Sequence, residues 1–166
     1  MEDRGTATVA AEINILAKIL SSLVKRDLER RLQCHGVSLG TLPYGVLRLL
    51  NYESQTISEL SRKMHLTAAT LVPVVDSLER DGLARRGQDP RDRRRIPLSI
   101  TERGADVLAR VPFIDPDDSL MSSLNRMGEE QSRQLLMLMR QLVAAMSDDG
   151  ETMVEEVSAV TRSLGR

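Results

Sequence analysis

The chain has 166 residues, of which 41% are hydrophobic, 28% charged and 2% aromatic. This length allows one compact domain, or a small domain with added dimerisation helices. The balance of apolar and charged residues excludes a disordered chain. We expect no membrane span, because no apolar run approaches the length of one. We also expect no signal peptide, because charged residues follow Met1. We therefore expect a cytoplasmic protein.

The chain offers few residues for catalysis or metal binding. Cys34 is the one cysteine, which excludes an internal disulfide and a cysteine zinc cluster. The two histidines, His35 and His65, are far apart in sequence and form no catalytic or metal-ligating pattern. We expect neither an enzyme nor a bound cofactor or metal.

Charge is distributed unevenly along the chain. The net formal charge is −1, but residues 1–59 carry a net charge of 0, residues 60–100 carry +4 and residues 101–166 carry −5. A phosphate backbone responds to the local field rather than to the overall charge. The basic middle segment is therefore compatible with nucleic-acid binding.

The first half of the chain predicts two helices. Residues 8–34 form a long helix that Gly36 ends, and residues 42–52 form a second helix, with Thr41 as its cap and Pro43 in its first turn. The apolar residues of the long helix recur at helical spacing: Val9, Ile13, Leu16, Leu20, Leu23 and Leu28.

A helix-turn-helix pattern follows. Thr56 and Glu59 form a capping box for a short helix that ends near Met64. Thr67 then caps a helix that Gly82 ends, with one buried stripe of apolar residues: Leu71, Val74, Val75 and Leu78.

Residues 83–86 and 95–100 predict two short strands around a charged, turn-rich tip, and Pro97 suits an edge strand. Thr101 caps a helix that runs to about Val111, and another helix begins at Pro116. The last strong helix opens at Gly128 and ends near Met146, and residues 148–166 are a tail in which a short helix is one reading. The fold class is mainly α with a two-stranded β-wing.

Residues 60–108 resemble the MarR family of winged helix-turn-helix transcriptional regulators. The resemblance is carried by three stretches at the family's spacing: Val75–Leu83 at the helix end, Asp89–Arg94 at the wing tip, and Leu98–Gly104 after the wing. It implies a homodimer with interlocked terminal helices, on double-stranded DNA with a palindromic site.

The resemblance also implies a domain organisation. Residues 1–36 are an N-terminal dimerisation helix, and residues 37–111 are the DNA-binding domain. Within that domain, the helix-turn-helix occupies residues 56–82 and the wing residues 83–100. Residues 112–147 are C-terminal dimerisation helices, followed by the tail at 148–166.

The wing is the most basic part of the sequence, with Arg91, Asp92, Arg93, Arg94 and Arg95 in succession. Four guanidinium groups this close together repel one another, and phosphates relieve that repulsion. In the family's wing signature, Asp92 holds Arg94 so that Arg94 enters the minor groove. The alternative is an ordinary solvated run of charges.

The predicted recognition helix lacks the side chains that usually read bases. Its candidate DNA-contacting residues are Thr67, Ala68, Ala69, Thr70, Val72, Pro73 and Ser77. The first half contains no Arg, Lys, Asn or Gln, so the bidentate pairings with G or A are absent. Its small apolar groups suit thymine methyl groups, and we expect much of the affinity to come from phosphates and DNA shape. Pro73 is interpreted as a local adjustment of the helix.

Candidate phosphate contacts are Arg62, Lys63, Arg85 and Arg86, although an ordinary exposed face explains Arg62 and Lys63 equally well. Candidate effector or redox residues are Cys34, His35, Tyr44 and Arg48. We expect His35, Tyr44 and Arg48 to line a cleft between the first two helices and the DNA-binding lobe. A buried structural role is the favoured interpretation of Cys34, and a role as an oxidant sensor is the alternative. The sequence thus predicts a dimeric DNA-binding regulator. The family resemblance implies a repressor that a small effector or an oxidant releases from DNA. The alternative is a winged-helix protein-interaction module that does not bind an operator.

Overall fold

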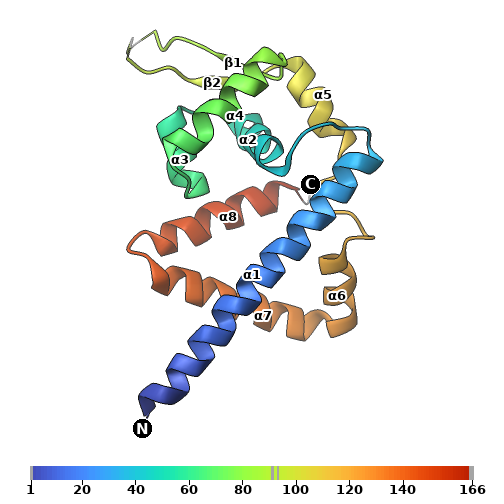
Figure 1. The fold of residues 1–166 in the computed structure, drawn as a ribbon, viewed down its shortest axis with the longest axis vertical. Helices are drawn as coiled ribbons and strands as arrows, with labels where there is room; N and C mark the ends of the chain where they lie inside the picture. The colour runs from blue at the N-terminus through green and yellow to red at the C-terminus, as the bar shows by residue number, and fades with distance from the viewer. Residues whose placement is uncertain (1, 91, 93, 165–166) are drawn as a thin grey trace. The chain divides into compact units, whose positions relative to one another are not determined.

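The computed structural model describes residues 2–90, 92 and 94–164, and it divides into two compact units, Met1–Pro112 and Phe113–Arg166. Its described residues are mostly helical, with one two-stranded antiparallel sheet (Figure 1). This confirms the predicted fold class.

Helix α1 (Glu2–Cys34) opens the first unit and begins earlier than predicted. Its last turns are packed, with Leu32 2% exposed, whereas apolar side chains from Val9 to Val24 lie open, as Leu16 does at 55%. By length and composition alone, Gly5–Cys34 qualifies as a candidate membrane span, because it contains an 18-residue window with a mean hydropathy of 1.5 in which no residue is buried. The expectation that no apolar run reaches this length was therefore wrong.

Helix α2 (Thr41–Tyr52) runs through the centre of the first unit, where Val46 and Leu47 are fully buried. The residue at its N-cap is Gly40, which makes no side-chain capping bond. Thr41 is therefore the first helical residue and not the predicted cap, because the extended backbone that precedes the helix ends one residue earlier.

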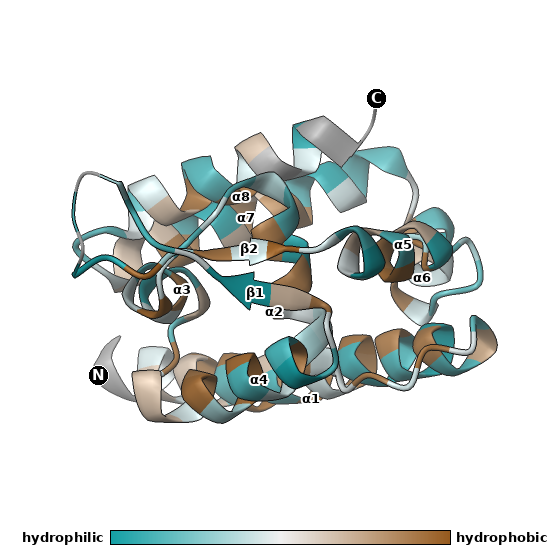
Figure 2. Ribbon diagram, turned by 90° about the horizontal axis from the view of Figure 1, so that it is seen from above, coloured by the Kyte–Doolittle hydropathy of each residue, from teal (hydrophilic) through white to brown (hydrophobic). Residues whose placement is uncertain are grey.

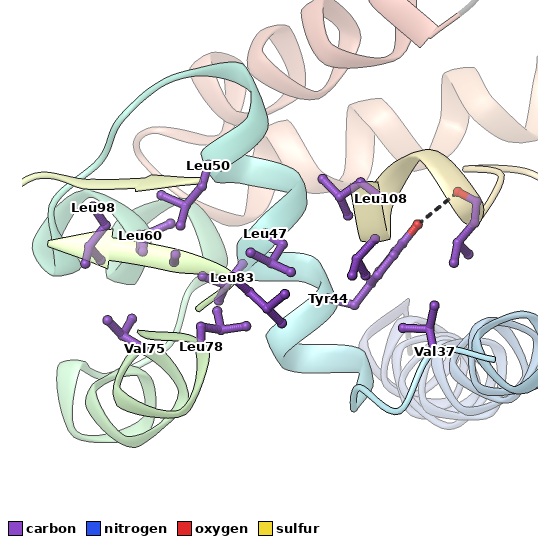
Figure 3. Close-up of a cluster of buried hydrophobic side chains, with 14 of the residues drawn as sticks. Val37, Tyr44, Leu47, Leu50, Leu60, Val75, Leu78, Leu83, Leu98 and Leu108 are labelled. Atoms are coloured by element: carbon purple, nitrogen blue, oxygen red, sulfur yellow. Dashed lines mark hydrogen bonds between the residues drawn. The ribbon is translucent and has the colours of Figure 1, made fainter. Parts of the chain in front are cut away.

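Three helices and the sheet surround α2: α3 (Ile57–Met64), α4 (Ala68–Arg80), β1 (Ala84–Arg86), β2 (Leu98–Ile100) and α5 (Glu102–Arg110). Figure 3 shows Leu47 of α2 facing side chains from the neighbouring elements, among them Leu83 and Leu108. Burial of this one cluster fixes how the helix-turn-helix and the sheet sit against each other.

The two strands pair in the register Ala84 with Ile100 and Arg86 with Leu98. Both are shorter than predicted. Leu98 also exchanges backbone hydrogen bonds with Gln55, at 2.8 and 3.0 Å, so the far edge of β2 is partly covered. The pairing of Gln55 with β2 was not predicted, because Gln55 lies outside any alternating apolar pattern.

The second unit contains α6 (Ser119–Met127), α7 (Glu129–Met146) and α8 (Gly150–Leu164). The prediction that a helix begins at Pro116 was wrong. The backbone N–H of Asp117 donates to the Asp115 carboxylate at 2.9 Å, which holds a turn, and α6 starts after it. Helix α7 begins and ends as predicted, and the tail forms α8 rather than remaining irregular.

Candidate nucleic-acid interface

The helix-turn-helix begins with the predicted capping box. The backbone N–H of Thr56 donates to the Glu59 carboxylate at 2.7 Å, and the backbone N–H of Glu59 donates to the Thr56 hydroxyl at 3.3 Å. The Thr56 N–H is the main reason that the pKa of Glu59 is lowered. The turn after α3 uses His65 in the left-handed conformation, at φ 52°, and Thr67 caps α4 through the N–H of Thr70. These local bonds fix where α4 starts.

Helix α4 presents the expected two faces. Leu71, Val75 and Leu78 are at most 1% exposed, and Val74 is half-buried at the margin of the stripe. On the other side, Ala68, Ala69, Thr70, Val72 and Pro73 are exposed, and Ser77 lies half-buried on the flank. The helix remains continuous through Pro73, which agrees with a local adjustment. The lost backbone bond is tolerated because Pro73 lies on the solvent side.

The wing, which contains β1 and β2, lies between α4 and α5 in the chain. Beyond the paired strands, the N–H of Gly87 donates to the Pro97 carbonyl at 2.7 Å. Pro97 has no N–H to return, so regular pairing stops there and β2 is shorter than predicted, although the N–H of Asp89 still donates to the Arg95 carbonyl at 3.3 Å. Figure 2 shows that β1 is hydrophilic over most of its length, which matches its two arginines.

Arg86, predicted to contact phosphate, faces the recognition helix instead. Its guanidinium forms ion pairs with Asp76, at 2.5 Å, and with Glu79, and its backbone N–H also donates to Glu79. The hydrogen bond to Asp76 is the main reason that the pKa of Arg86 is raised. The side chain is 30% exposed. With two carboxylates already bound, Arg86 joins β1 to α4 and is not a free cation for DNA.

Arg95 makes a second connection, from the wing to α3. Its guanidinium pairs with Glu59 at 2.8 Å and with Asp89 at 3.3 Å. The hydrogen bond to Glu59 raises the pKa of Arg95. Arg95 was predicted to bind DNA with the other wing arginines, but here it forms an ion pair with Glu59, an acidic residue 36 positions away in sequence.

Asp92 holds the wing tip in a different way from the one predicted. Its carboxylate accepts the backbone N–H of Arg94 at 2.9 Å, and these two described residues form no side-chain ion pair. The brace therefore shapes the turn and leaves the Arg94 guanidinium exposed. Arg91 and Arg93, the other two wing arginines, lie outside the described residues.

The remaining basic residues divide into paired and unpaired groups. Lys63 pairs with Glu53 at 2.7 Å, so it is partly neutralised. Among the residues that the structure describes in the helix-turn-helix and the wing, Arg62, Arg85 and Arg94 are exposed and have no ion-pair partner. Counting basic residues in the sequence overstated the free positive charge, because pairing depends on contacts between distant segments.

The candidate effector residues do not form one site. Cys34 and His35 are exposed, which contradicts the favoured interpretation of Cys34 as buried. Tyr44 is 4% exposed, and its hydroxyl accepts the Arg48 Nε–H at 2.9 Å and donates to the Val111 carbonyl at 3.4 Å (Figure 3). Arg48 Nη2 donates to the same carbonyl at 2.7 Å. Tyr44 and Arg48 therefore hold the end of α5 rather than line a cleft.

A pocket of about 450 Å³ lies in the first unit, and none of these four residues lines it. It is formed by the loop after α1, the segment after α4 and α5. Its apolar walls are Val37, Leu39, Leu83 and Val107, and its charged groups are Arg103, Arg110, Asp81 and Asp106. No group of three metal-ligating side chains occurs in the part of the chain that the structure describes.

Comparison with known proteins agrees with this geometry. The model of the MarR family matches residues 45–96, from the middle of α2 to the wing. This part of the chain is similar to the MarR family. The MarR-family match thus covers the capping box, the recognition helix and the wing as far as residue 96, but not β2.

Curated relatives support the same assignment. The organic hydroperoxide resistance transcriptional regulator of Bacillus subtilis is 27% identical over 85 residues, which are 51% of this chain and 56% of that protein. A putative transcriptional regulatory protein for the hcr operon of Thauera aromatica is 38% identical over 69 residues, which are 41% of this chain and 42% of that protein. The chain thus spans about half the length of the curated relatives it matches.

Solved structures show that the MarR fold extends beyond the matched segment. Wild-type MarR from E. coli, in its apo form, has a TM-score of 0.65 at 18% identity, covering 78% of this chain and 96% of that one. CouR from Rhodococcus jostii RHA1, bound to p-coumaroyl-CoA, has a TM-score of 0.63 at 24% identity, covering 83% and 95%. At these identities the likeness concerns the fold alone.

Proposed function

We propose that the protein is a DNA-binding transcriptional regulator that acts in the cytoplasm as a homodimer on a palindromic site. The observation that carries the proposal is the placement of three unpaired arginines, Arg62, Arg85 and Arg94, on the elements that flank the exposed face of α4. In a helix-turn-helix protein, cations in these positions contact phosphates while the second helix enters the major groove.

The exposed apolar residues of the terminal helices support the homodimer. In α1, Ile13, Leu16 and Leu20 are 39–55% exposed, and in α7, Leu136, Leu138 and Met139 are 45–51% exposed. Contiguous apolar surface of this kind marks a protein or membrane contact. We favour a second copy over a membrane as the occupant, because a two-fold pair presents one α4 to each of two successive major grooves.

We further propose that the regulator is a repressor whose DNA affinity is lowered by a small effector. CouR, which shares the fold, is described as a transcriptional repressor bound to a 23-mer DNA duplex, and also as bound to p-coumaroyl-CoA. The pocket between the loop after α1 and α5 offers an effector an apolar lining with both basic and acidic groups, Arg103 and Arg110 beside Asp81 and Asp106. Release by oxidation of Cys34 has less support, since no ion pair or hydrogen bond joins this exposed thiol to a basic side chain in the part of the chain that the structure describes.

The test begins with duplexes selected from a randomised DNA library by the full chain. Their affinity is then measured by fluorescence anisotropy over a range of salt concentrations. If each of the three arginines in both protomers neutralises one phosphate, log Kobs falls with log salt with a slope of about −5 or steeper. Arg94→Ala is expected to weaken binding and flatten this slope, whereas Arg133→Ala, on exposed α7, leaves both unchanged.

Failure to select any duplex would favour the second candidate, a winged-helix protein-interaction module. The observation in its favour is that the exposed first half of α4 carries no long hydrogen-bond donor. Repression is tested separately, with a reporter gene placed behind the selected sequence. Co-expression of the regulator is expected to lower reporter output, and an increase would instead identify an activator.

A further inference from the structure

The first two turns of α4 form an exposed surface of unusual chemistry for a recognition helix. Residues 68–74 read Ala-Ala-Thr-Leu-Val-Pro-Val, and Thr70 is their one polar side chain. Leu71 and Val74 point to the core or its margin. The side chains left to meet a ligand are those of Ala68, Ala69, Thr70, Val72 and Pro73, with Val72 39% exposed.

The polar groups at the edges of this surface are already occupied. The hydroxyls of Thr67 and Thr70 lie 2.9 Å apart in a hydrogen bond, and the Thr67 hydroxyl also accepts the N–H of Thr70. The Asp76 carboxylate is bound by Arg86 at 2.5 Å. The Thr67–Thr70 pair uses one of its two hydroxyl hydrogens and is oriented by the helix cap, and the Asp76 carboxylate is shared with the wing, so these groups have little freedom to turn toward a base edge.

What remains on the surface is a patch of methyl and methylene groups. In the major groove, three of the four bases present hydrogen-bonding groups without a methyl, and thymine adds the C5-methyl group. A small apolar surface gains free energy against that methyl and loses it against bare polar edges, which it strips of water without compensation.

We propose that α4 reads thymine C5-methyl groups, so that the preferred DNA carries thymine at the base pairs that face Val72 and its alanine neighbours. The inference rests on the proposed function and adds how that site chooses sequence. The patch is a DNA surface rather than a protein-docking surface because unpaired Arg62 and Arg85 lie on α3 and β1, the elements packed against α4. Cations on both elements that neighbour an apolar patch suit a polyanion with methyl groups in its groove.

The test replaces thymidine by deoxyuridine, which removes the methyl group and leaves every hydrogen-bonding group unchanged. Duplexes selected by the full chain are resynthesised with one such replacement in each half-site. Burial of one methyl-sized group per half-site corresponds to an affinity loss of about tenfold for the symmetric pair. Deoxyuridine at flanking positions outside the half-sites is the matched control and leaves the affinity unchanged.

Val72→Ala then links the effect to the protein. Because Val72 is 39% exposed, its truncation does not endanger the fold, and a thermal melt verifies this. The variant is expected to prefer thymidine over deoxyuridine by about threefold or less, in place of about tenfold, at the position that Val72 contacts. Loss of discrimination at that position alone supports the assignment.

The outcomes separate this inference from the proposed function. If no sequence-specific duplex is selected, the proposed function fails. If a specific duplex is selected and deoxyuridine at every half-site position leaves its affinity unchanged, the methyl readout is overturned while DNA binding stands. Discrimination of the same size in Val72→Ala at every position also overturns the assignment to this patch.

Discussion

Arg85 and Arg86 are neighbours on β1 that the structure assigns to opposite tasks. Arg86 turns toward Asp76 and Glu79 of α4, whereas Arg85 is exposed with no ion-pair partner among the described residues. Replacing either by alanine removes one positive charge from nearly the same place. The two variants therefore have equal net charge, and any difference between them reports the pairing.

Arg86→Ala is expected to lower the free energy of unfolding by about 1 kcal/mol. Two partly exposed ion pairs are each worth a few tenths to about 1 kcal/mol, and water screens a side chain that is 30% exposed. Because the pKa of Arg86 is raised in the folded protein, the stabilisation from its charged form is fully present below the pKa that Arg86 has in the unfolded chain, and so throughout the neutral range. Arg85→Ala is expected to change the stability by less than about 0.5 kcal/mol.

DNA binding reverses the order of the two variants. Arg85→Ala is expected to make the slope of log Kobs against log salt shallower by about 1 per protomer, because one phosphate contact is lost. Arg86→Ala keeps the slope and weakens binding through the loosened wing.

Urea denaturation at fixed protein concentration and anisotropy titrations measure these two effects. The reasoning is refuted if Arg85→Ala destabilises the fold as much as Arg86→Ala does. It is equally refuted if Arg86→Ala flattens the salt slope more than Arg85→Ala.

Three further predictions concern packing, pH and assembly. A Cβ at Gly104 would lie 2.2 Å from the Leu83 carbonyl oxygen, so Gly104→Ala is expected to cost about 2–3 kcal/mol in thermal or urea unfolding, whereas Gly5→Ala, with nothing within 4 Å, does not destabilise. The lowered pKa of Glu59 means that its ionised carboxylate stabilises the fold above the ordinary pKa of 4.5, and that this stabilisation is lost as pH falls through the pKa of the folded state. The difference in free energy of unfolding between wild type and Glu59→Gln is therefore expected to shrink from pH 7 to pH 3, and a constant difference would contradict this. Leu16→Glu places a charge in the exposed apolar stripe of α1 and is expected to yield monomers in sedimentation, so an unchanged dimer mass would exclude this stripe from the interface.

Cys34 shows how the sequence misleads when packing is at issue. A cysteine at the end of an amphipathic helix is usually buried. This one is exposed because it lies two positions after buried Leu32, which places the two side chains on roughly opposite sides of the last turn of α1. Tyr44 and Arg48 were wrongly predicted to line a cleft, because they are polar side chains on the second helix. Instead both side chains form hydrogen bonds with the Val111 carbonyl, more than 60 positions away, with Tyr44 buried and Arg48 half-buried.

The sequence by itself determined the features that depend on neighbouring residues. The capping box of Thr56 and Glu59, the cap at Thr67 and the buried face of α4 all rest on contacts within one or two helical turns. Such contacts follow from the order of residues, because helix geometry sets the distances.

Only the tertiary structure decided which arginines are free. Arg86 and Arg95 lie in the same basic run as Arg85 and Arg94, yet each is bound by carboxylates from another element. The sequence fixes how many charges are present, but the pairing of charges depends on how α3, α4 and the wing pack around one core. The same packing brings Gln55 to the edge of β2, which no local pattern indicates.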